Sequence, residues 1–197
     1  MTPRILVFAG STRSGALSGK TADAAMKELA LLGADVTRIS LADYPLPLMD
    51  QDLEREKGIP ESAVKLAHMI SAHDGILIAT PEYNSSLPPL LKNAIDWVSR
   101  VKADPQGRSM RAFSGKTVAL CSSSNGNFAG IRSINHLRAV LVHCQAEVLT
   151  SQCSVPRAQE AFDEKGDFIE DRLKNAMTKT CRALIEHARI FSTRAEV

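Results

Sequence analysis

The stretch ILVFAGSTRSGALS, residues 5–18, decides the fold of this chain. It starts within a short apolar run, residues 4–9, that is typical of a strand buried on both faces. The run ends in a loop rich in glycine and hydroxyl residues, and an amphipathic helix is predicted after it over residues 17–32. A strand that leads through such a loop into a helix is the opening unit of a parallel α/β sheet.

The rest of the chain repeats this alternation of strand and helix. A long loop rich in proline and aspartate is predicted at residues 42–58, and a polar loop at residues 104–115. No internal repeat or linker divides the chain, so residues 1–197 are expected to form a single domain. Right-handed crossovers arrange the strands in the order 2-1-3-4-5, in a parallel sheet with helices on both faces. Further strands are predicted at residues 35–41, 74–80, 116–122 and 146–150, and further helices at residues 60–72, 88–102, 129–144 and 168–190.

The bulk composition argues against several classes of partner. The 197 residues include 24 lysines and arginines against 22 aspartates and glutamates, which gives a formal net charge of +2. So small a charge gives no reason to expect nucleic acid or an anionic membrane as a partner. No apolar run has the length of a signal peptide or a membrane span, and the four cysteines form no CxxC pair. These features predict a cytoplasmic protein with free thiols and no metal site.

Two loops define a candidate ligand site. Residues 10–18 follow the first strand, and residues 81–86 follow the third. In the order 2-1-3-4-5 these two strands are neighbours, so both loops lie at the switch point where open α/β sheets bind ligands. A third loop, residues 122–127, follows the fourth strand and is predicted to add a wall of small residues.

The residue types in the first two loops fit a phosphate and a flat ring. Ser11 and Ser18 offer hydroxyl donors, and Arg13 offers a forked cation, beside the positive end of a helix. Tyr83 offers an aromatic face, and Asn84 offers polar groups for the edge of a heterocycle. Together the two loops predict a cradle for flavin mononucleotide (FMN).

Two other interpretations of the first loop remain open. In one, the serines only cap a helix and Arg13 is a solvated charge. In the other, residues 15–21, GALSGKT, form a P-loop for a nucleoside triphosphate. The P-loop pattern GxxxxGK[ST] needs one more residue between Gly15 and Gly19, and the predicted third and fourth strands end without the acidic residue that holds magnesium. The chain also has no GxSxG motif, which leaves hydrolase chemistry with little support.

Longer stretches of the sequence resemble a known family. PEYNSSLP at residues 81–88, with LKNAIDW at residues 91–97, is similar to the signature of the NAD(P)H-dependent FMN reductases of flavodoxin-like fold. That family includes bacterial quinone, chromate and azo-dye reductases. The resemblance extends over nearly the whole chain through GSTR at residues 10–13, GIR at 130–132, HLR at 136–138 and AFDE at 161–164.

The resemblance implies a role for residues in all three loops. The residues that would hold the FMN phosphate are Ser11, Arg13 and Ser18. Those that would lie along the isoalloxazine ring are Pro81, Glu82, Tyr83 and Asn84, with Ser122 and Gly126 near its pyrimidine side. The chain departs from the family pattern at Ala16 and Ser18, where Ser and Asn are usual, and at Asn125 and Ala129, where Pro and Gly are usual.

The activity implied by the resemblance needs no catalytic side chain. FMN takes a hydride from NADPH or NADH at its N5 atom and then passes electrons to a second substrate in the vacated site, in a ping-pong sequence. The second substrate would be a quinone, a free flavin, an azo compound or a metal oxyanion. The alternative is a flavodoxin-like electron carrier or an FMN-dependent regulatory module, although carriers of that fold are usually strongly acidic and this chain is not.

The predicted helix at residues 88–102 has two apolar stripes. One can face the sheet, whereas Leu90, Trp97 and Val101 point elsewhere. A surface helix that is apolar on two sides needs a second cover, which predicts a homodimer or a homotetramer built partly through this stripe. The resemblance also implies oligomers. The alternative is that the loop at residues 42–58 folds over the stripe.

Overall fold

The computed structural model describes residues 2–103 and 106–192, so residues 104–105 of the predicted polar loop lie outside the described part. A parallel sheet of five strands in the order β2-β1-β3-β4-β5 forms its centre, which confirms the predicted strand order. The strands are β1 (Arg4–Ala9), β2 (Asp35–Ile39), β3 (Gly75–Pro81), β4 (Thr117–Ser123) and β5 (Glu147–Val155). The helices are α1 (Leu17–Leu31), α2 (Gln51–Lys57), α3 (Glu61–Ser71), α4 (Pro89–Arg100), α5 (Ile131–His143) and α6 (Asp171–Ser192), with a short 3-10 turn η1 (Leu41–Asp43).

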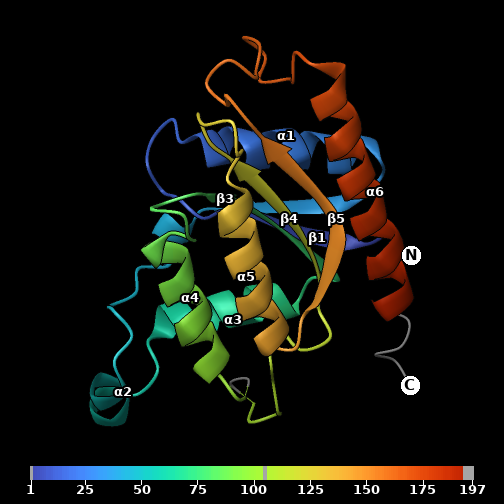
Figure 1. The fold of residues 1–197 in the computed structure, drawn as a ribbon. Coiled ribbons are helices and arrows are strands. Elements are labelled where there is room, and N and C mark those ends of the chain that lie inside the picture. The colour runs from blue at the N-terminus through green and yellow to red at the C-terminus, as the bar shows by residue number, and fades with distance from the viewer. Residues whose placement is uncertain (1, 104–105, 193–197) are drawn as a thin grey trace.

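The sheet is the middle layer of three (Figure 1). Successive strand residues face opposite sides, so Leu6 and Ile76 join the core beneath α3, α4 and α5, whereas Val7 and Leu77 join the core beneath α1 and α6. Because β1 and β3 are covered on both sides, they read as continuous apolar runs. Within the described ranges, no helix has the length and apolarity that crossing a membrane requires.

The last strand is longer than the prediction of residues 146–150. Val118 pairs with Val148 and Leu120 pairs with Gln152, so two steps along β4 match four along β5, and a bulge holds the extra residues. Arg138 of α5 holds this bulge, donating to the carbonyl oxygens of Val148 at 3.2 Å and Leu149 at 2.6 Å. The polar residues in the bulge interrupt the apolar pattern, which is why the sequence shows only the first half of the strand.

The segment at residues 42–58 is not a simple loop. It contains η1 and the helix α2, which begins after Asp50, whose carboxylate accepts hydrogen bonds from the backbone N–H groups of Asp52 and Leu53. No residue of α2 is buried, so the helix shows no apolar stripe in the sequence. The segment lies along α4: Pro47 O accepts hydrogen bonds from Trp97 Nε1 at 2.8 Å and from Asn93 Nδ2 at 2.9 Å.

These contacts overturn the expectation that the second stripe of α4 faces a partner subunit. Trp97 is fully buried and Val101 is 3% exposed, so the chain covers both residues itself. Only Leu90, at 38% exposed, remains open to solvent. The physical reason is that the segment at residues 42–58 folds over the helix and supplies its second cover, which was the alternative to a partner subunit. The stripe therefore gives no argument for an oligomer.

Candidate functional site

The first and second predicted loops meet at the carboxyl edge of the sheet. Gly10 follows β1, and its N–H donates to Ala79 O of β3 at 2.8 Å. A Cβ atom at residue 10 would come within 3.1 Å of Leu91 Cδ2 and within 3.3 Å of both Pro81 Cδ and Pro88 Cγ. Glycine is needed here because the two loops approach each other so closely.

The first loop contains one buried hydroxyl group that has no partner within the protein. Ser18, in the first turn of α1, is 1% exposed, and its Oγ atom has no hydrogen-bond partner. A buried hydroxyl without a partner costs about 1–3 kcal/mol, and a ligand with a hydrogen-bonding atom at this place would satisfy it. The N-cap of α1 is Ala16, which makes no side-chain capping bond, so the serines do not serve as plain helix caps.

Arg13 is exposed, and it precedes Ser18 by five residues in the sequence. Its backbone N–H donates to Ser11 Oγ at 3.3 Å, and its guanidinium donates to the carbonyl oxygen of Ser14 at 3.4 Å. The first turn of α1 contains no acidic residue. A cation, hydroxyl groups and a helix N-terminus without an acidic neighbour in its first turn are the donor set that a phosphate group requires.

The second loop is a tight turn. Tyr83 and Ser86 exchange two backbone hydrogen bonds of 3.0 Å, and the residues between them, Asn84 and Ser85, have φ values of 48° and 63°. Asparagine tolerates this left-handed conformation better than most residues. The side chain of Tyr83 is 47% exposed. The turn therefore holds an aromatic ring and a backbone of fixed shape at the edge of the sheet.

Helix α5 fastens the second loop at three points. Ser133 Oγ donates to Pro81 O at 2.8 Å, and Ser86 Oγ is hydrogen-bonded to His136 Nδ1 at 3.0 Å. Between them, Glu82 accepts from the backbone N of Arg132 at 3.1 Å and from its Nη2 at 2.8 Å. The carboxylate of Glu82 is thus engaged within the protein, which leaves the backbone of the turn to face a ligand.

Residues of the third loop divide between the interior and the surface. Ser122 is fully buried, and its Oγ donates to Ala129 O at 2.7 Å, so its side chain shapes the loop from within. Ser123 Oγ is buried without a partner. Gly126 is exposed, and its N–H donates to Ser124 Oγ at 3.1 Å. Of the two predicted residues here, only Gly126 stands at the surface.

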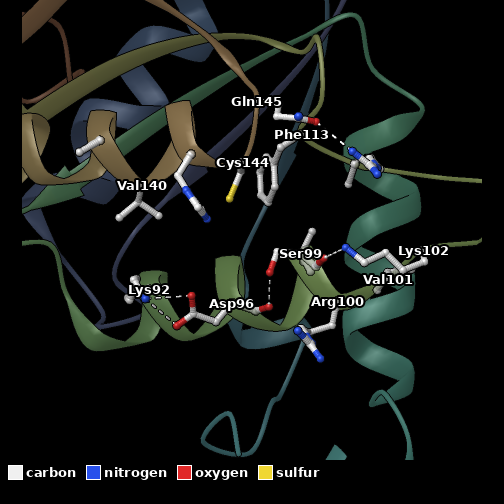
Figure 2. A pocket seen from close by; sticks show the side chains of 15 residues that line it. Lys92, Asp96, Ser99, Arg100, Val101, Lys102, Phe113, Val140, Cys144 and Gln145 are labelled. Atoms are coloured by element: carbon white, nitrogen blue, oxygen red, sulfur yellow. Dashed lines mark hydrogen bonds and ion pairs between the residues drawn. The ribbon is translucent and has the colours of Figure 1, made fainter. Parts of the chain in front are cut away.

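A large cavity lies between α4 and α5, toward the C-terminal ends of these helices (Figure 2). It has a volume of about 820 Å³ and is lined by α4 from Lys92 to its C-terminal end, by the C-terminal half of α5 and by Phe113. Cys144 points into it, and burial raises the pKa of this thiol. The cation Arg100 lies in the last turn of α4 and complements the negative end of its dipole, and His143 is the last residue of α5. The cavity is therefore separate from the loops at the carboxyl edge.

The buried thiols are not candidates for nucleophiles. Cys121 and Cys153 are neighbours on β4 and β5, and Cys181 of α6 packs in the same core. Hydrogen bonding to Cys153 and burial raise the pKa of Cys121, and burial raises that of Cys181. These two thiols stay protonated at neutral pH. Among the described residues, no group of three or more metal-ligating side chains is placed to hold a metal ion.

Known proteins of similar structure share this architecture. The flavoenzyme NAD(P)H:(acceptor) oxidoreductase FerB from Paracoccus denitrificans superposes with a TM-score of 0.76 at 25% identity, over 96% of this chain and 99% of its own. The fold is thus the flavodoxin-like α/β class that the sequence predicted.

Sequence comparison then assigns the family. The model of the NADPH-dependent FMN reductase family matches residues 3–160. The NAD(P)H-dependent FMN reductase PA1204 of Pseudomonas aeruginosa is 35% identical over 183 residues, 92% of either chain. A quinone reductase of Escherichia coli K12 is 38% identical over 147 residues, which are 74% of this chain and 73% of its own. This chain belongs to the NADPH-dependent FMN reductase family, which confirms the prediction of an FMN-dependent oxidoreductase that uses NAD(P)H.

Proposed function

We propose that this protein transfers electrons from NADPH or NADH to a quinone at the carboxyl edge of its sheet, with free flavins, azo compounds and metal oxyanions as further acceptors. The observation that carries the proposal is the meeting of two loops at the switch point, one with an unpartnered buried hydroxyl and an exposed arginine, the other a rigid turn. The quinone reductase of Escherichia coli and a 2-hydroxy-1,4-benzoquinone reductase of a Burkholderia species, 32% identical over 181 residues, support quinones as the acceptor class.

The residues of the loops would divide the work of binding FMN. Ser11, Arg13 and Ser18 would hold its phosphate, since they combine hydroxyl donors with a cation at a helix N-terminus. The turn formed by Pro81, Glu82, Tyr83 and Asn84 would hold the isoalloxazine ring, and the backbone near Ser122 and Gly126 would contact its pyrimidine side. Bound FMN supplies the hydride chemistry, accepting two electrons from the nicotinamide and passing them to the acceptor.

The protein contributes position and rigidity. The three bonds from α5 hold the 81–86 turn in one conformation before any ligand arrives, so little conformational entropy is lost on binding. Tyr83 remains exposed beside it, which leaves one side of the site open for a nicotinamide and then for an acceptor. We also place the protein in the cytoplasm, because its four cysteines are free.

Steady-state kinetics test the proposal against the carrier alternative. With NADPH and 1,4-benzoquinone varied together, the account expects double-reciprocal plots with parallel lines, because both substrates use one site in turn. A chain that oxidises NADPH only when a second redox protein is added would be a carrier or a regulatory module, and the proposal would fail.

We also propose a homodimer or a homotetramer, because the family resemblance implies oligomers. Val142 of α5 is apolar and 56% exposed, which makes the exposed face of α5 a candidate contact surface. Light scattering at micromolar concentration should therefore give two or four times the chain mass of 21.3 kDa. Val142→Lys should lower that mass, whereas Leu31→Lys, at an 83% exposed site on α1, should leave it unchanged. A parent protein that scatters as a single chain contradicts this expectation.

A further inference from the structure

The β4–α5 loop displays an aromatic ring on a fixed backbone. Phe128 lies in this loop, and its carbonyl oxygen accepts from Ile131 N at 3.0 Å. The next two residues, Ala129 and Gly130, have φ values of 55° and 78°. A Cβ atom at residue 130 would lie 3.0 Å from Ser122 Cβ, so the loop packs closely on the end of β4. The backbone that follows Phe128 is thus held against the end of β4.

A chain of contacts places this ring beside the 81–86 turn. The guanidinium carbon of Arg132 lies over the Phe128 ring, 4.9 Å from its centroid. The same guanidinium donates to Glu82 at 2.8 Å. One charged group therefore joins the ring to the turn that would carry the isoalloxazine, and it occupies one face of the ring.

The opposite side of the ring is not buried by the protein. Phe128 is 67% exposed. Among the described residues, the large aromatic side chains that stand exposed are Phe128 and Tyr83, and they lie on neighbouring loops at this one edge. Solitary exposed apolar residues are normal, but two aromatic rings on two fixed loops beside one ligand site form a rim suited to a flat ligand.

We propose that Phe128 is a specificity-determining residue that binds the ring of planar aromatic electron acceptors by offset stacking. The inference rests on the proposed function and deepens it by naming the residue that distinguishes acceptor shapes. Arg132 is a positioning residue: held by Glu82, it fixes the ring from one face and leaves the other for the acceptor. A planar quinone gains this contact, whereas an octahedral, non-aromatic acceptor such as ferricyanide does not.

The test compares two acceptors in the FMN-loaded enzyme. Phe128→Ala should raise the KM for 1,4-benzoquinone about threefold to tenfold, within the range expected for loss of a stacked ring contact. The kcat/KM for ferricyanide should stay within twofold. Phe128→Tyr keeps a planar ring and should keep the parent KM, while Phe128→Leu, apolar but not planar, should resemble Phe128→Ala. Leu31→Ala, on α1, is the matched surface control.

Three results would overturn the inference. Equal changes for quinone and ferricyanide would show a general loss of structure, and no change for either would show that the ring does not touch the acceptor. A fall in the mass measured by light scattering for Phe128→Ala would show that the ring covers a subunit interface. Failure of the proposed function looks different: the parent enzyme itself would then not reduce benzoquinone with NADPH, and the inference would fall with it.

Discussion

Replacing Trp97 with alanine is expected to lower the free energy of unfolding by about 3–5 kcal/mol. Trp97 is fully buried between α4 and the segment at residues 42–58, and its indole N–H donates to Pro47 O at 2.8 Å. The substitution leaves a cavity and also removes one of the two hydrogen-bond donors to Pro47 O, the other being Asn93 Nδ2. Because a domain of this kind is stable by only about 5–15 kcal/mol, the loss should be plain in a urea unfolding curve.

Leu90→Ala on the same helix is the matched control. Leu90 is 38% exposed, so its truncation should change the free energy of unfolding by less than about 1 kcal/mol. If Trp97→Ala left the unfolding curve in place but converted an oligomer into single chains, Trp97 would face a partner subunit after all.

Arg13→Ala is expected to weaken FMN binding by roughly 10- to 150-fold, the equivalent of the about 1.5–3 kcal/mol that a charge-assisted hydrogen bond contributes. Riboflavin lacks the phosphate, so its affinity should be nearly the same in the variant and the parent. Quenching of flavin fluorescence measures both dissociation constants.

Lys20→Ala serves as the control for this prediction. Lys20 is exposed and lies in the first turn of α1, beyond the loop that contains Arg13. Its removal should change FMN affinity less than threefold. Equal losses of FMN and riboflavin affinity in Arg13→Ala would show that Arg13 does not contact the phosphate. Loss of nucleotide binding in Lys20→Ala, together with magnesium-dependent ATP hydrolysis by the parent, would restore the P-loop interpretation.

The sequence predicts the sheet well because its central strands are buried on both faces. Continuous apolar runs such as β1 and β3 admit few other structures, and right-handed crossovers then leave one strand order. The edge strand β5 was predicted too short, since its bulge depends on Arg138, a residue of another element. The helix α2 was missed because a helix without buried residues has no apolar periodicity.

The candidate site shows the same division. The loops at residues 10–18 and 81–86 were found from residue type and from the topology that joins them. The sequence does not reveal the three hydrogen-bonded contacts from α5, because they link residues about fifty positions apart, such as Glu82 and Arg132. A retrospective signal exists: Arg132 and His136 are four residues apart on one helix face, opposite a polar loop. Trp97 was misplaced for a related reason, since a helix pattern shows that a face is apolar but not what covers it.

The visible spectrum of the purified protein shows whether the chain binds FMN and reduces it with a nicotinamide. After incubation with FMN and removal of the free cofactor by gel filtration, the account predicts a protein-bound flavin band that bleaches without oxygen on addition of NADPH or NADH and returns when 1,4-benzoquinone is added. A protein that emerges colourless from the column after this treatment, or one whose bound flavin stays oxidised with both nicotinamides, would contradict the account.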